Sequence, residues 1–186
     1  MSTDSIQVAS AFERAIAPRA PLYALLDAAR ESDGPYQARE AGVAHDSLFA
    51  GELGELLAAV APYVIDFRRD SSFYPWWFEQ WGRSIGVLVE APVSLPELRR
   101  HFRTLLTVRG EQRKQYYFRF YDPRVLRVFL PSCTPDELRR FYGPITAFYC
   151  ESEDGGELLS YTLTPDGVSV KRNPVPLPST QAERRL

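Results

Sequence analysis

The chain has few of the residues on which disulfide bonds, metal sites and histidine catalysis depend. Its 186 residues include two cysteines and two histidines, and no apolar run approaches the length of a membrane span. Cys133 and Cys150 fit no metal-ligand pattern, so we expect two free thiols, as is usual in the cytosol. The N-terminal stretch MSTDSIQVAS has neither the basic nor the apolar region of a secretory signal.

Catalysis also lacks a signature in the sequence. His45 lies in a polar segment and His101 on the exposed side of a predicted helix, and neither has a nucleophile close to it in the sequence. The motifs GxxxxGK(S/T), GxGxxG and HExxH are absent. We therefore expect no catalytic residues and no bound cofactor.

The composition is that of a globular protein with an uneven distribution of charge. The chain is 45% hydrophobic and 13% aromatic and carries a net charge of −2. We expect one domain over residues 1–172 and a disordered, proline-rich tail over 173–186. Between Arg99 and Arg140 there are eleven basic and four acidic residues, so the middle of the chain is basic although the whole is not.

Hydrophobic periodicity predicts strands that alternate with helices. Strands are expected over 22–26, 63–67, 84–89, 116–121, 145–149, 158–163 and 168–171, and helices over 5–17, 51–60, 73–81, 95–107, 123–130 and 134–141. The polar segment 30–48 is expected to be loop with some helix. This alternation predicts an α/β fold with a mixed, mostly parallel sheet flanked by helices, and the last three strands predict an antiparallel end to the sheet.

The stretch QYYFRFYDPRVLRVFLP, residues 115–131, carries the densest local signals. Its alternating aromatic residues predict a central strand over 116–121. Asp122 is a favourable N-cap and Pro123 a favourable first helical residue, so a helix should begin there. Pro131 disfavours helical backbone at the residue before it, so this helix should end by Leu130.

The predicted helix 95–107 has both a start signal and a basic face. Ser94 and Glu97 have the spacing of a capping box. Arg99, Arg100 and Arg103 fall on the outward side of the helix, which makes them the candidate protein-binding residues. Arginines next to the aromatic residues of 116–121 would also suit nucleic acid, and a nucleic-acid-binding module remains an alternative.

Acidic residues at the ends of predicted strands give a second alternative. Asp27, Asp66, Glu90 and Asp122 lie at or near strand ends, where ligands gather in parallel α/β sheets. Together they could hold a divalent cation in a metal-dependent hydrolase. Capping roles for Asp27 and Asp122 compete with that interpretation, and we expect no metal site.

Several segments together resemble the adaptor-chaperone family of bacterial type VI secretion over about residues 20–145. They are FRFYDPRVL at 118–126, Leu130-Pro131, ELRRF at 137–141, Gly143-Pro144, LYALLD at 22–27, Ala61-Pro62-Tyr63, Trp81-Gly82 and Gly86-Val87. The resemblance implies a non-enzymatic protein of the bacterial cytoplasm that binds a secreted effector and loads it onto a VgrG-type spike. The net charge of −2 and the lack of a long apolar run lead us to expect no nucleic-acid or membrane partner. The family-motif residues, expected to be mainly structural, are Phe118, Arg119, Phe120, Tyr121, Asp122, Pro123 and Arg124.

Overall fold

The computed structural model of the protein describes residues 3–49, 51, 55–109 and 114–176. The strands are β1 (Leu22–Asp27), β2 (His45–Ser47), β3 (Pro62–Asp66), β4 (Gly86–Glu90), β5 (Thr107–Arg109), β6 (Gln115–Tyr117), β7 (Ala147–Glu151), β8 (Glu157–Thr164) and β9 (Gly167–Pro174). The helices are α1 (Thr3–Ala15), α2 (Gly34–Glu40), α3 (Glu55–Ala58), α4 (Phe73–Glu79), α5 (Leu95–Leu105), α6 (Pro123–Ser132) and α7 (Pro135–Tyr142). None of these described helices is long and apolar enough to cross a membrane.

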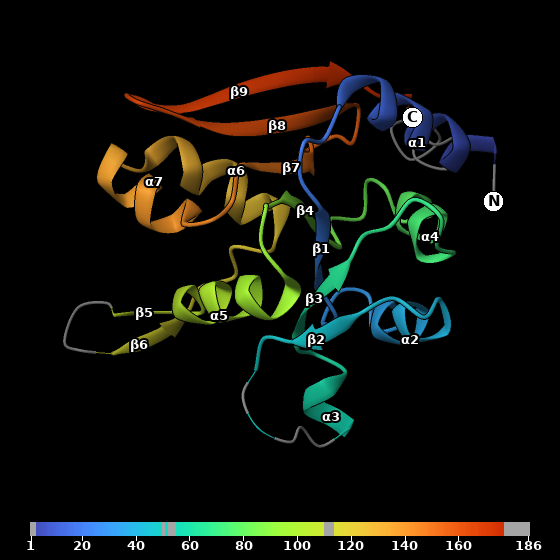
Figure 1. Ribbon diagram of the computed structural model, residues 1–186, viewed down its shortest axis with the longest axis horizontal. Helices are drawn as coiled ribbons and strands as arrows, with labels where there is room; N and C mark the ends of the chain where they lie inside the picture. The colour runs from blue at the N-terminus through green and yellow to red at the C-terminus, as the bar shows by residue number, and fades with distance from the viewer. Residues whose placement is uncertain (1–2, 50, 52–54, 110–113, 177–186) are drawn as a thin grey trace.

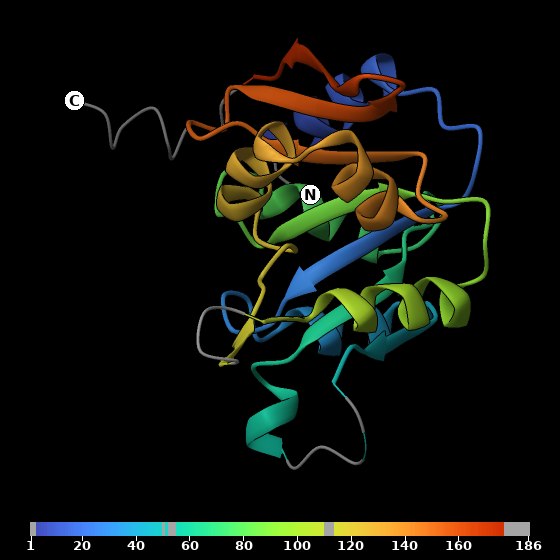
Figure 2. The ribbon, with the colours of Figure 1, turned by 90° about the vertical axis from the view of Figure 1, so that its left-hand side faces the viewer.

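The fold has three layers, with a central sheet between two groups of helices (Figure 1). The main sheet has seven strands in the order β2-β3-β1-β4-β7-β8-β9, and β5 and β6 form a separate hairpin. Helices α1, α2 and α4 cover one face, while α5, α6 and α7 cover the other (Figures 1 and 2). The helices α1, α2 and α4 enclose the first core with one face of the sheet, and α5, α6 and α7 enclose the second core with the other face. Successive residues of β1 point to opposite faces, so Ala24 and Leu26 pack in the first core and Tyr23 and Leu25 in the second.

The sheet is antiparallel at every strand pair, so the prediction of a mostly parallel sheet is wrong. Strands β1 and β2 are parallel to each other but flank β3, and β3 and β4 are parallel but flank β1. The chain therefore has helical crossovers between parallel strands, as the alternation indicated. However, the two strands that each crossover connects are not neighbours, because an antiparallel strand lies between them. The error comes from β2, which lies in the segment expected to be loop. Without β2, the chain from β1 to β3 resembles one parallel crossover.

The aromatic stretch before α6 is not a central strand, which corrects the second main expectation. Only β6 is extended there, and it pairs with β5 outside the main sheet. Tyr116 is 53% exposed and Tyr117 is 72% exposed. Phe120 is fully buried, but against helical residues such as Phe102, whose ring centroid lies 5.5 Å away. Alternating aromatic residues describe a buried strand and an exposed hairpin equally well, and here the hairpin forms.

Local start signals were mostly confirmed. Asp122 caps α6, and Thr134 forms the complete capping box of α7 with Glu137. Ser94 occupies the N-cap position of α5, but its side chain makes no capping hydrogen bond, so the capping box expected there is wrong. Helix α6 also continues through Pro131 to Ser132, beyond its predicted end. Near the end of a helix a proline removes only one hydrogen bond, which the rest of the helix tolerates.

The remaining predicted elements are found within a few residues of their expected bounds. The helix expected over 51–60 is described only as α3, since residues 52–54 lie outside the described part of the chain. Strand β9 continues through Pro174, so the sheet includes two residues of the segment expected to be disordered. Val175 is buried as well, and its N–H donates to the carbonyl of Gly156 at 2.9 Å. The Pro174 position is compatible with a strand because β9 is an edge strand.

The placement of α6 in the second core gives a stability prediction. Leu126 is fully buried, whereas Val128 on the same helix is 74% exposed. Leu126→Ala should lower the free energy of unfolding by about 2–5 kcal/mol, because it leaves a cavity. Val128→Ala should change it by less than about 0.5 kcal/mol. Urea denaturation of both variants measures the difference, and equal stabilities would contradict this packing.

Candidate protein-binding site

The end of β1 and the loop before α6 are joined by an ion pair between two family-motif segments. The Asp27 carboxylate is 1% exposed and accepts a hydrogen bond from Nη2 of Arg119. Its other oxygen accepts the N–H of Ala29 at 3.2 Å. A buried carboxylate without a counter-charge is strongly unfavourable, so Arg119 is needed wherever Asp27 is buried. The pair therefore holds the segment 118–122 against the sheet.

The N-cap of α6 is a second ion pair beside the first. Asp122 is 2% exposed and accepts hydrogen bonds from the backbone N–H of Arg124 at 3.0 Å and from its Nε and Nη2 at 3.0 and 2.6 Å. Burial alone would raise the pKa of Asp122, but the hydrogen bonds and charge of Arg124 hold that pKa below its ordinary value. The carboxylate thus caps the helix and fixes the guanidinium in a bidentate arrangement.

Tyr121 and the arginines stay protonated at neutral pH. Burial, together with the nearby charge of Asp27, raises the pKa of the Tyr121 phenol to about 12. The hydrogen bond to Asp27 raises the pKa of Arg119, and the hydrogen bond to Asp122 raises that of Arg124. None of these three groups can transfer a proton near neutral pH. The motif segment 118–124 has the contacts of a structural element.

The acidic residues that the alternative of a metal-dependent hydrolase would bring together lie at opposite ends of the strands. Asp27 pairs with Pro62 at the start of β3, while Asp66 and Glu90 lie beside the opposite end of β1. Glu90 is buried and accepts hydrogen bonds from the Tyr149 hydroxyl at 2.6 Å and from a backbone N–H at 3.0 Å. In the described ranges, no three His, Cys, Asp or Glu side chains are grouped so that they could hold a metal ion. Antiparallel strands separate carboxyl ends that a parallel sheet would bring together.

The cysteines and histidines are used in packing and local hydrogen bonds. Both cysteines are free, and burial raises the pKa of Cys133 and brings that of Cys150 to about 12. Nε2 of His101 lies 2.8 Å from the carbonyl oxygen of Phe141, and Nδ1 of His45 lies 2.9 Å from the carbonyl oxygen of Val43. Thiols with raised pKa values are poor nucleophiles.

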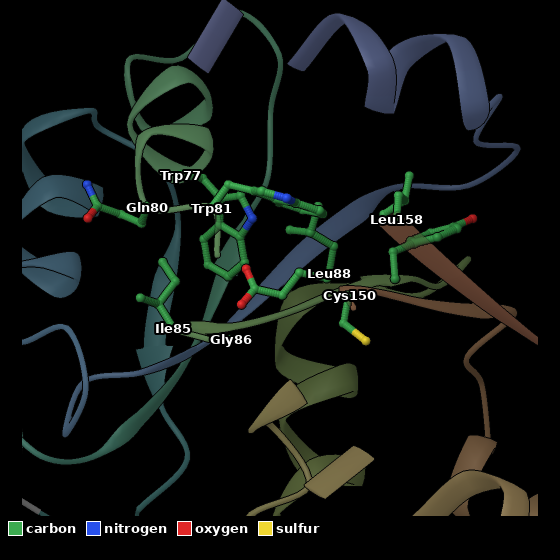
Figure 3. A pocket seen from close by; sticks show the side chains of 10 residues that line it. Trp77, Gln80, Trp81, Ile85, Gly86, Leu88, Cys150 and Leu158 are labelled. Atoms are coloured by element: carbon green, nitrogen blue, oxygen red, sulfur yellow. The ribbon is translucent and has the colours of Figure 1, made fainter. Parts of the chain in front are cut away.

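A small enclosed space lies between α4 and the sheet, next to Trp81 and Cys150 (Figure 3). Its volume is about 10 Å³, which is enough for one water molecule but for no substrate. The Glu151 carboxylate at its wall accepts hydrogen bonds from Gly82 and Ser84. Burial raises the pKa of Glu151. This space is part of the packing of the first core.

The three candidate arginines of α5 have different environments. Arg99 donates from Nε to the carbonyl of Ser47 at 2.6 Å and lies 3.1 Å from the carboxylate of Asp46. Its side chain is only 22% exposed, so the expectation that it faces solvent is corrected: Arg99 attaches α5 to β2. Arg100 and Arg103 are exposed. Because β2 was not predicted, nothing in the sequence separated Arg99 from the other two.

An open apolar groove between α5, β5, α6 and α7 is a feature that the sequence did not indicate. Its volume is about 420 Å³. The residues that line it include Leu105, Val108, Phe118, Phe129, Arg140 and Phe141. A central strand over 116–121 would have placed Phe118 inside the sheet, so this surface could not be foreseen. All of its lining residues except Phe141 come from the basic middle of the chain.

The family-motif residues 118–124 and most of the groove lie within a region shared with other proteins. A family model described as a domain of unknown function, DUF4123, matches residues 22–140. This range contains β1 with Asp27, the ion pairs of the 118–124 segment and most of the groove. No curated protein and no solved structure matches the chain.

The ion pair between Asp27 and Arg119 should contribute measurably to stability. Arg119→Met leaves a buried carboxylate without its counter-charge and should cost about 1–3 kcal/mol. The expected loss of unfolding free energy is smaller than for breaking a fully buried ion pair, because the Arg119 side chain is 43% exposed. In a double-mutant cycle with Asp27→Asn, the coupling energy should exceed that of the exposed pair Asp136 and Arg139. Equal coupling energies would show that Arg119 does not hold the loop.

The cap of α6 predicts a pH dependence. Asp122→Ala should cost about 0.5–2 kcal/mol at neutral pH. The folded-state pKa of Asp122 is lowered, so the stability that comes from its charge is present above the unfolded value of about 3.9 and lost as the pH falls through the folded value. The difference in unfolding free energy between wild type and variant should therefore shrink below about pH 4. Denaturation curves at several pH values test this, and a constant difference would contradict it.

Proposed function

We propose, since the chain belongs to the DUF4123 family, that it is a non-enzymatic adaptor of the bacterial cytoplasm that binds a secreted effector and loads it onto the VgrG-type spike of a type VI secretion system. The link to type VI secretion rests on the resemblance of the FRFYDPR segment, residues 118–124, to adaptor-chaperones of that system. The observation that carries the proposal is the contrast between this segment and its neighbourhood. Its charged residues Arg119, Asp122 and Arg124 are occupied by internal ion pairs, while the groove that Phe118 lines is open and apolar.

Such a surface favours a protein partner over a small substrate. Protein interfaces are enriched in arginine and aromatic residues, and both line this region. Arg100, Arg103 and Arg140 are exposed and form no ion pair with any residue that the structure describes. Guanidinium groups can bind carboxylates of a partner in a bidentate way and accelerate its approach.

The two alternatives from the sequence are less well supported. A metal-dependent hydrolase would need Asp27 and Glu90 near each other, and they lie at opposite ends of the adjacent strands β1 and β4. A nucleic-acid-binding module would use the arginines together with exposed aromatic residues such as Tyr117. That possibility is tested directly by the experiment below.

The experiment is co-purification of the tagged protein with the effector and the spike protein encoded beside its gene. Wild type should retain both, and deletion of its gene should abolish secretion of that effector but not of others. Arg100→Glu combined with Arg103→Glu should keep the melting temperature and weaken retention, because both side chains are exposed. Lys171→Glu combined with Arg172→Glu reverses the same charge on β9 and should leave retention unchanged.

If the wild-type protein co-purifies with neither the effector nor the spike protein, the adaptor function is contradicted. A salt-sensitive electrophoretic shift of random DNA, lost in the α5 double variant, would support nucleic-acid binding instead.

A further inference from the structure

We propose that the groove between α5 and α7 receives an amphipathic helix of the partner protein, with an apolar stripe flanked by carboxylates. This inference rests on the proposed adaptor function and names the chemistry of the segment that the adaptor recognises. It follows from the floor of the groove, its continuation onto the hairpin, its charge and its walls.

The floor of the groove is a preformed aromatic cluster. The ring centroids of Phe118 and Phe129 lie 4.6 Å apart, those of Phe129 and Phe141 lie 5.1 Å apart, and those of Phe118 and Phe141 lie 6.4 Å apart. Phe141 is buried, while Phe118 and Phe129 keep part of their surface accessible. Rings fixed by mutual packing lose little conformational freedom when a partner covers them. The floor is therefore suited to take up apolar side chains.

The apolar surface continues from the groove onto the β5–β6 hairpin. Val108 lines the groove and is 44% exposed. Its cross-strand partner in the hairpin is Tyr116, so the two side chains lie on one face of the hairpin. The hairpin projects away from the main sheet next to α5 (Figures 1 and 2). Exposed apolar side chains next to an apolar groove are typical of an interaction site.

The charge at the groove selects an acidic partner. Arg140 lines it, and Arg100 and Arg103 are exposed on α5, the helix that contributes Thr104 and Leu105 to the lining. The acidic residue of the lining, Glu137, accepts hydrogen bonds from the N–H and the hydroxyl of Thr134 at 2.8 Å each, and it keeps its negative charge near Arg140. Arg140 is thus partly compensated, whereas the exposed Arg100 and Arg103 form no ion pair with any described residue, so the positive charge beside the groove favours a partner that brings carboxylates. The C-terminal residues 177–186 have two arginines and one glutamate, which is the wrong sign for an internal occupant.

The walls of the groove favour a helix as the bound segment. Side chains of α5, α6 and α7 form most of them, and β5 and Phe118 complete the lining, so the site offers apolar contacts along helices. A volume of about 420 Å³ suits the several anchor side chains that one face of an amphipathic helix presents at positions i, i+3 or i+4, and i+7. A bound helix would then extend the helical layer on this face of the sheet.

Two synthetic peptides with an identical Leu and Phe stripe test the inference, one with Glu and the other with Lys at the flanking positions. Fluorescence anisotropy of the labelled peptides should show the Glu peptide binding at least about tenfold more tightly than the Lys peptide. Val108→Asp should weaken binding of the Glu peptide about tenfold or more, and Arg140→Glu should remove or reverse the preference. Val170→Asp and Lys171→Glu, matched exposed changes on β9, should have no effect. Equal binding of both peptides, no binding, or binding unchanged by Val108→Asp would overturn the inference.

The same variants separate this inference from the adaptor function. If wild type and Val108→Asp both retain the effector, the adaptor function stands and the groove is not its site. If wild type retains no partner, the adaptor function fails, and the peptides alone decide whether the groove binds an acidic helix. A second copy of the chain could also fill the groove, and analytical sedimentation of the protein without peptide tests this. A dimer that Val108→Asp converts to a monomer would show that the groove binds a second copy, which also overturns the inference.

Discussion

The arrangement of the molecule depends on the buried carboxylate of Asp27 and its guanidinium partner Arg119, which are 92 positions apart in the chain. This contact determines where the loop before α6 meets the sheet. Once Arg119 is fixed, Phe118 and Phe120 are directed into the helical layer, and Asp122 is placed to begin α6. The groove beside this loop exists because the loop is held in this position.

The features that the sequence predicted are those that depend on neighbouring residues. Asp122 and Thr134 act as caps because the N–H groups that they satisfy lie two and three positions further along. The helices α1 and α4 and the final strands were likewise indicated by periodicity alone. Ser94 shows the limit of such patterns: the spacing to Glu97 is correct, but the side chain makes no capping bond.

The features that the sequence did not predict depend on contacts between distant segments. The three residues of β2 form a strand because β3 lies beside them, and their own sequence carries no strand signal. Because β2 was not predicted, β3 was expected to run parallel to β1, and the contact of Arg99 with β2 was not foreseen. The groove could not be predicted either, because it arises from the relative positions of α5, β5, α6 and α7. The aromatic residues that form its floor were visible in the sequence, but in a strand they would have been covered.

The direct antiparallel pairing of β4 with β7 has a consequence for how this surface can vary. Residues 91–146, which carry α5, the hairpin, α6 and α7, leave the sheet at one strand and return at its neighbour. The ends of this excursion are fixed by the hydrogen bonds of the two strands, whatever lies between them. The length of a connection affects stability only weakly once its ends are held. Insertions or exchanges that keep Arg119 and its contact with Asp27 can therefore reshape the groove for a different partner, while the register of the sheet and the first core stay as they are.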